Sequence, residues 1–224
     1  MWCIPPKQNA AFVCCMEQVL EVYTRPYDPL RPVVCMDEMP KQLLGESAPA
    51  TVMAPGRPKR VDHEYVRHGT CTVWMFTEPL GAWRDVRVSE RRTSIDWAHQ
   101  IRALLEDHRY CVAERITLVC DNLSTHALSS LYQAFEPAEA LHLAHRLEIV
   151  HTPKHGSWLN IAEIELSVLS RQCSRARMAS IEALDKEIQA WQHHRNQSQR
   201  GVDWHFATPD ARAKLKRLYP HVKL

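Results

Sequence analysis

The chain has 224 residues, of which 45% are hydrophobic and 24% are charged, a balance typical of a folded globular domain rather than a disordered chain. No stretch approaches about 18 consecutive apolar residues, and Met1–Pro6 lacks a secretory signal, so we expect a cytoplasmic protein without a transmembrane helix. The net charge of +2 hides a basic segment, because residues 171–224 hold 11 Lys and Arg but 5 Asp and Glu. That segment either contacts a polyanion or forms a solvated helical face.

The first part of the chain is predicted to be rich in strands. Apolar residues recur with helical periodicity over residues 8–23, and the apolar run at residues 33–36 is typical of a buried strand. Residues 45–60 contain several Pro and Gly and are predicted to form a loop. An antiparallel meander is then predicted, with strands at residues 61–67, 70–77 and 84–88 and turns at His68-Gly69 and Pro79-Leu80-Gly81.

The rest of the chain alternates between helices and strands. Capping residues predict helices that start at Thr93 or Ser94, at Ser180 and at Thr208. Further strands are predicted at residues 116–120 and 147–150, and further helices at residues 124–135, 138–145 and 157–173. This order predicts an α/β fold with a mixed sheet and helices on both faces. None of the eight cysteines forms a Cys-x-x-Cys pair, which argues against a zinc site or a disulfide framework.

Two carboxylates stand where predicted buried strands end, and a third belongs to a later helix. Asp37 follows residues 33–36 and Asp121 follows residues 116–120. The helix that begins near Ser157 carries both Glu163 and Glu165, and spacing alone does not decide between them. Carboxylate oxygens are ligands suited to Mg²⁺ or Mn²⁺. Two such ions can activate the attacking oxygen and stabilise the leaving oxygen of a phosphodiester.

Three segments carry a resemblance to a known family. They are residues 33–38 (Val-Val-Cys-Met-Asp-Glu), 118–126 (Leu-Val-Cys-Asp-Asn-Leu-Ser-Thr-His) and 152–163 (Thr-Pro-Lys-His-Gly-Ser-Trp-Leu-Asn-Ile-Ala-Glu). The sequence resembles the catalytic region of a DDE transposase, in the bacterial insertion-sequence branch related to the mariner superfamily. The resemblance implies a ribonuclease-H-like, five-stranded mixed sheet flanked by helices. It also implies Asp37, Asp121 and Glu163 as catalytic metal ligands, with Glu163 selected over Glu165 by the Leu-Asn-x-x-Glu pattern.

The resemblance divides the chain into three parts and implies its partners. Residues 1–32 are an N-terminal helix and linker, residues 33–173 are the catalytic domain, and residues 174–224 are a basic helical extension packed on that domain. Mg²⁺ or Mn²⁺, in two copies, is the implied cofactor. The implied partners are transposon ends, target DNA and further copies of the chain, with no membrane partner and with association with the nucleoid when DNA is bound.

Several residues near the three carboxylates have two interpretations. They are candidates for contact with DNA or for support of a metal ligand, and equally for packing or solvation: Asn122, Lys154, His155, Trp158, Arg171 and Arg175. For Trp158 we favour packing at the start of its helix. Glu38 and Glu165 are either solvated or supporting.

Three functions are compatible with the sequence. We expect an enzyme that cuts phosphodiester bonds at transposon ends and transfers the freed strand into target DNA. The family's usual N-terminal helix-turn-helix region has no counterpart in this sequence. The alternative is therefore a truncated, non-mobile remnant that binds or dampens a full-length transposase. A ribonuclease-H-like nuclease or resolvase is a third, weaker alternative.

Overall fold

The centre of the protein is a five-stranded mixed sheet. The structure is a computed structural model that describes residues 4–47, 56, 64–173, 177–198 and 201–220. Three antiparallel strands come first, β1 (Val33–Glu46), β2 (Tyr65–Glu78) and β3 (Trp83–Ser89). Two shorter strands, β4 (Ile116–Cys120) and β5 (Leu147–His151), run parallel to β1, giving the order β3-β2-β1-β4-β5. The predicted five-stranded mixed sheet is confirmed.

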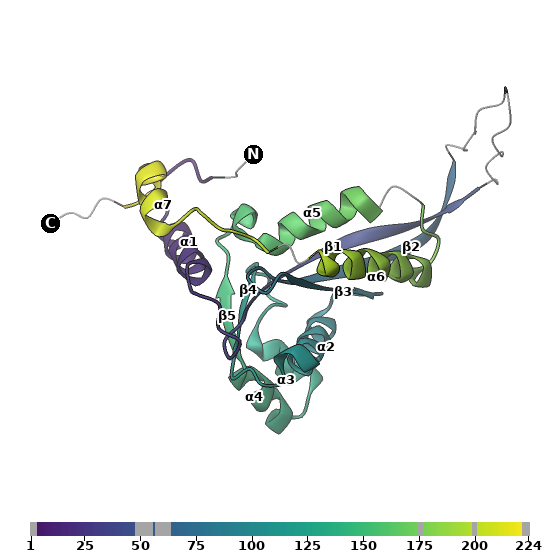
Figure 1. Ribbon diagram of the computed structural model, residues 1–224, viewed down its shortest axis with the longest axis horizontal. Coiled ribbons are helices and arrows are strands. Elements are labelled where there is room, and N and C mark those ends of the chain that lie inside the picture. Colours follow the sequence, from purple (N-terminus) through teal and green to yellow (C-terminus); the bar gives the residue numbers. More distant parts are fainter. Residues whose placement is uncertain (1–3, 48–55, 57–63, 174–176, 199–200, 221–224) are drawn as a thin grey trace.

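Helices cover both faces of this sheet, as Figure 1 shows. One core lies under α2 (Ser94–Leu105), α3 (Leu131–Ala134) and α4 (Pro137–His145). The other lies under α1 (Ala10–Tyr23), α5 (Ile161–Cys173), α6 (Ile181–Gln197) and α7 (Thr208–Lys214). Successive strand residues alternate between the two cores: Val34 and Met36 belong to the first and Cys35 to the second. Because strand side chains alternate between faces, a continuous apolar run is what a sheet covered on both sides requires.

The strands β1 and β2 are longer than predicted, and His68-Gly69 is not a turn. The register jumps between Gln42↔Thr70 and Leu44↔Arg67, so residues 68 and 69 form a bulge inside one continuous β2. Gly69 has φ +96°, a conformation that side chains disfavour. A bulge and a tight turn both demand such a residue, and local sequence does not distinguish them.

Two predicted helices are interrupted. Of residues 124–135, only the 3₁₀ turn Leu128–Ser130 and the short α3 are helical. The predicted helix at residues 157–173 starts as a 3₁₀ turn, Ser157–Leu159, breaks at the extended Asn160, and continues as α5. Thr93 and Ser180 do cap their helices, but the N-cap of α7 is Ala207, whose backbone N–H is bound by Asp210, so the predicted Thr208 cap was wrong.

Side chains of α6 cover the free edge of β3. Asn196 bonds both the N–H and the carbonyl of Arg84, at 2.9 and 2.8 Å. Gln192 accepts from the N–H of Val86, and Gln189 donates to its carbonyl. These bonds satisfy backbone groups that an uncovered edge strand would offer to another chain. All seven cysteines in the described part of the chain are free, and no described helix is long and apolar enough to cross a membrane.

Candidate active site

The sheet brings the two aspartates together. β1 and β4 are parallel neighbours, with Cys35 paired with Val119, so Asp37 and Asp121 lie two residues further along at the same edge. Glu163 lies in the first turn of α5, which packs against β1. All three side chains line one cleft of about 400 Å³, together with Glu38, Met39, Thr152, Ser157, Asn160, Leu166, Ser167 and Ser170. The three carboxylates that the resemblance implies as metal ligands therefore line one cleft.

Asp37 is the carboxyl group with the most perturbed protonation. Burial raises its pKa to about 7, opposed by a hydrogen bond of 2.9 Å from the backbone N–H of Glu38. The negative charges of Glu38, Asp121 and Glu163 contribute to this raised pKa. A carboxyl group that is buried beside other carboxylates holds its proton until a cation compensates the charge.

His126 holds the second aspartate, a contact that sequence analysis missed. Its Nδ1 lies 2.6 Å from Oδ1 of Asp121, its Nε2 lies 3.4 Å from Oε2 of Glu38, and the ring stacks on Trp97 at 5.9 Å. Burial lowers the pKa of His126, but hydrogen bonds to Asp121, Cys120 and Glu38 outweigh that effect and raise it to about 12. The only signal in the sequence was a histidine five residues after Asp121.

Glu165 belongs to a different environment from Glu163. It is 3% exposed and pairs with Arg84 and Arg195, both at 3.0 Å. Burial raises its pKa, but the hydrogen bonds from Arg195 and Arg84 prevail and lower it. Glu163 instead shares the cleft face of α5 with Leu166, Ser167 and Ser170. The two glutamates point to opposite sides, as an offset of two helical positions requires.

Of the other candidate residues, those that the structure describes do not line the cleft. Asn122, Lys154, His155 and Arg171 are exposed, and His155 has the left-handed φ of +64°. Trp158 is half-buried and its ring meets Phe206 at 6.1 Å. Arg175 lies outside the described residues. Roles in DNA contact for these side chains stay predictions. Among the residues that do line the cleft, Thr152 and Ser170 had no role predicted from the sequence, and Asn160 figured only in the Leu-Asn-x-x-Glu pattern.

The carboxylate oxygens of Asp37, Asp121 and Glu163 are the type of ligand that a hard divalent cation prefers, although they are not gathered around one point. Within the described residues, no three His, Cys, Asp or Glu side chains are close enough to hold one ion. Oδ1 of Asp121 is engaged by His126, and Oδ1 of Asp37 by the N–H of Glu38. The all-oxygen set and the proton-holding Asp37 nevertheless fit Mg²⁺ or Mn²⁺, which bind carboxylates and compensate their repulsion.

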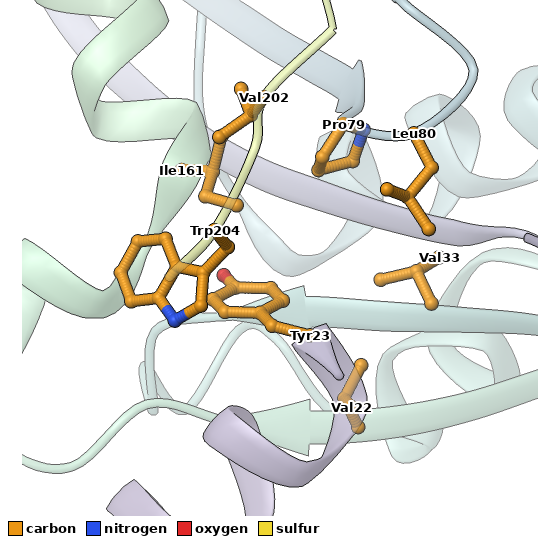
Figure 2. Close-up of a pocket in the computed structure, with 8 residues that line it drawn as sticks. All are labelled: Val22, Tyr23, Val33, Pro79, Leu80, Ile161, Val202 and Trp204. Atoms are coloured by element: carbon orange, nitrogen blue, oxygen red, sulfur yellow. The ribbon is translucent and has the colours of Figure 1, made fainter. Parts of the chain in front are cut away.

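A second cavity lies beside Ile161, the first residue of α5 (Figure 2). It holds about 20 Å³ and is lined by Val22, Tyr23, Val33, Pro79, Leu80, Ile161, Val202 and Trp204. Such a volume holds about one water, and its lining is almost entirely apolar. We interpret it as a packing gap where α1, α5 and the C-terminal segment meet.

Comparison with known proteins identifies what this fold and cleft resemble. Residues 32–185 match a family described as DDE superfamily endonuclease, and a search of the curated proteins gives no match. Among solved structures, the chain is similar to the Mos1 mariner paired end complex with Mn, with a TM-score of 0.56 and 16% identity over 88% of this chain and 60% of that chain. The chain is also similar to the mariner Mos1 paired end complex with Mg, with a TM-score of 0.52 and 15% identity over 91% of this chain and 66% of that chain.

A third similar structure is the Mos1 transposase paired-end complex with left transposon end, with a TM-score of 0.55 and 15% identity. The chain covers about 60% of that transposase chain. At this level of identity the likeness establishes the fold, which is ribonuclease-H-like as the resemblance implied. The metals and the transposon end named in these structures belong to the Mos1 complexes.

Proposed function

The chain belongs to the DDE superfamily endonucleases and has the catalytic fold of a mariner-type transposase, and on this premise we propose that it cuts DNA at transposon ends and joins them to target DNA. One observation carries the proposal: Asp37, Asp121 and Glu163, from three separate elements, line a single cleft. Three carboxylates at one cleft fit phosphodiester chemistry supported by divalent cations.

We assign Asp37, Asp121 and Glu163 as the residues that hold Mg²⁺ or Mn²⁺. When bound, two such ions activate the attacking oxygen and stabilise the leaving oxygen. Asp37 must release its proton before it can serve as a ligand, because its pKa is raised to about 7. His126 contacts Oδ1 of Asp121, so Oδ2 is the oxygen that we assign to the cation. Hydrogen-bonded partners of this kind fix the orientation of ligating carboxylates.

We propose DNA and further copies of the chain as partners. The structurally similar Mos1 complexes include a transposon end and are called paired end complexes. The exposed Lys154, His155 and Arg171 beside the cleft are suited to the DNA backbone, because positive and hydrogen-bonding side chains bind phosphate. Assembly of two transposon ends also calls for more than one catalytic domain, which motivates the proposal of self-association.

Strand cleavage of labelled DNA tests the proposed reaction. The protein is incubated with DNA that carries the element ends and with Mg²⁺ or Mn²⁺, and the nicked products are resolved. We expect cleavage by the wild-type protein and none by Asp37→Asn or Asp121→Asn, because each removes a charged ligand but keeps the shape of the side chain. Cleavage by either variant at the wild-type rate would falsify the assignment of this cleft.

A further inference from the structure

Asn160 occupies the break between the 3₁₀ turn Ser157–Leu159 and α5. Its backbone is extended and its side chain is 1% exposed. The carbonyl of Asn160 accepts from the N–H of Glu163 at 3.1 Å, and its Oδ1 accepts from the N–H of Ala162, also at 3.1 Å. Asn160 therefore acts as the N-cap of the helix turn that carries Glu163.

The other end of the same amide reaches across the cleft floor to β1. Nδ2 of Asn160 donates to the carbonyl of Met36 at 2.9 Å, and Met36 is the residue immediately before Asp37. One side chain thus joins the backbone beside Asp37 to the first turn of the helix that presents Glu163. The two joined residues, Met36 and Asn160, lie 124 positions apart in sequence.

A second group holds the same turn from behind. The hydroxyl of Tyr23 on α1 donates to the carbonyl of Leu159 at 2.7 Å, and its ring lies against Trp204 at 4.9 Å, as seen in Figure 2. The turn is therefore supported on its outer side by packing, while Asn160 is the group that ties it to the strand of Asp37.

We propose that Asn160 is a positioning residue that sets the separation of Asp37 and Glu163 and thereby the affinity of the cleft for divalent cations. This inference rests on the proposed function, because it assumes that both carboxylates bind the cation. Neither polar atom of Asn160 needs to touch the cation, since both are engaged by backbone groups. Groups that orient ligands in this way typically change metal affinity by about 10- to 100-fold when removed.

Replacement of Asn160 by serine separates the tether from the cap. Serine is a good N-cap, so it can still bind the N–H of Ala162, but it is too short to reach Met36. The matched control is Asn196→Ser, because Asn196 also uses both amide atoms on backbone groups, at 2.8 and 2.9 Å, but joins α6 to β3. Both variants lose an amide that joins a helix to a strand, and only Asn160→Ser loses it beside the cleft.

Binding of Mn²⁺ alone to the metal-free full chain is measured by electron paramagnetic resonance, together with the melting temperature. We expect Asn160→Ser to weaken Mn²⁺ binding about 10- to 100-fold, and Asn196→Ser to bind Mn²⁺ as the wild type does despite a comparable loss of melting temperature. Equal Mn²⁺ affinity of Asn160→Ser and wild type, or equal weakening in both variants, overturns the proposal. If Asn160→Ser does not fold, the measurement is made with Asn160→Thr, which also has a hydroxyl that can cap the helix.

The failure of this inference can be told from the failure of the proposed function. Loss of Mn²⁺ binding in Asp37→Asn and Glu163→Gln is the expected result if the cleft is the metal site. Wild-type affinity in those two variants overturns the proposed function together with this inference. Loss of binding in those variants, with wild-type affinity in Asn160→Ser, overturns only the role of Asn160.

Discussion

At the scale of single residues, the environment separates two glutamates that look equivalent in the sequence. Glu163 is exposed to the cleft, whereas Glu165 is buried between Arg84 and Arg195. Removing one partner of a buried ion pair lowers stability strongly, because the remaining buried charge is left without compensation. The side chain of Arg84 is 1% exposed, so we expect Glu165 to stabilise the fold, whereas Glu163 is available for chemistry.

We predict opposite effects for Glu163→Gln and Glu165→Gln. Glu163→Gln should abolish metal-dependent cleavage and change the free energy of unfolding by less than about 0.5 kcal/mol, as expected for an exposed position. Glu165→Gln should lower stability by about 3 kcal/mol but retain most cleavage at temperatures where it is folded. Urea denaturation and the cleavage assay measure the two effects. A dead Glu165→Gln beside an active Glu163→Gln would show that the third ligand is misassigned.

The raised pKa of Asp37 predicts a dependence of stability on pH. In the absence of metal, the pKa rises from an ordinary 3.8 to about 7 on folding, so between these values the folded state binds more protons than the unfolded state. Stability therefore falls as pH rises through this window, and the cost is fully present above about pH 7. The causes are burial and the facing charges of Glu38, Asp121 and Glu163.

Asp37→Asn should remove this cost. In EDTA, the variant should match the wild type near pH 4 and exceed its stability at pH 8 by on the order of 4 kcal/mol. Urea denaturation at a series of pH values measures the difference. The control is Asp203→Asn, because the wild-type Asp203 side chain is 86% exposed. This variant should have the same dependence of stability on pH as the wild type. A variant that gains no stability at high pH would contradict the raised pKa.

At the scale of elements, the bulge in β2 aligns two long strands. β1 and β2 pair from Cys35↔Thr77 to Glu46↔Tyr65, and the extra residue is absorbed at 68–69. Beyond Cys35, β1 has no pairing with β4 and becomes an edge, where Pro40 is tolerated. The bulge keeps the register of the strand segment that contains Asp37, so its backbone conformation matters for the site.

We predict that Gly69→Ala lowers the free energy of unfolding by about 1–2 kcal/mol. A Cβ at Gly69 meets nothing within 4 Å, so the cost comes from the φ of +96° and not from a clash. Thr70→Ala, at the neighbouring exposed position, is the control and should cost less than about 0.5 kcal/mol. Thermal and urea unfolding measure both. Equal stabilities of the two variants would mean that residue 69 is not held at positive φ.

At the scale of the whole molecule, α1 and the C-terminal segment pack against each other. Glu17 on α1 pairs with Arg212 on α7 at 2.8 Å and accepts from the hydroxyl of Tyr219 at 2.8 Å. The N–H of Asn9 donates to the carbonyl of Leu218 at 3.0 Å, and Figure 1 shows α1 and α7 side by side. Tyr23 on α1 and Trp204 in the C-terminal segment thus support the turn that precedes Asn160. The division at residues 32 and 173 stays a prediction.

Metal binding should stabilise the entire fold, because a ligand that binds only the folded state shifts the unfolding equilibrium. Mn²⁺ at a concentration 100 times its Kd should add about 2.7 kcal/mol to the free energy of unfolding. The gain should shrink in Asp121→Asn, which removes one ligand charge, and disappear in EDTA. Differential scanning calorimetry measures the effect. A gain in Asp121→Asn equal to that of the wild type would argue against binding at this cleft.

The sequence by itself determined the features that depend on local chemistry. Continuous apolar runs indicated that strands such as Ile116–Cys120 are covered on both faces, and hydroxyl side chains marked the caps at Thr93 and Ser180. Asp121 follows β4 directly, as predicted, whereas Asp37 lies inside the longer β1, just beyond Cys35, the last β1 residue paired with β4, so both aspartates lie where the parallel pairing ends. The strand assignments follow from the alternation of side chains along a strand, and the caps follow from the unpaired backbone N–H groups at the start of a helix. Both depend on residues that are close together in sequence.

Only the tertiary structure decided which groups meet across the chain. His126 contacts Asp121 only because the turn after β4 folds back over Glu38, and Glu165 is buried only because β3 and α6 each supply an arginine. The break at Asn160 depends on a carbonyl 124 positions away. The residues that neighbour a side chain in sequence are compatible with packing, solvation or metal coordination. Which of these occurs depends on the burial and the charges that distant elements bring to that side chain.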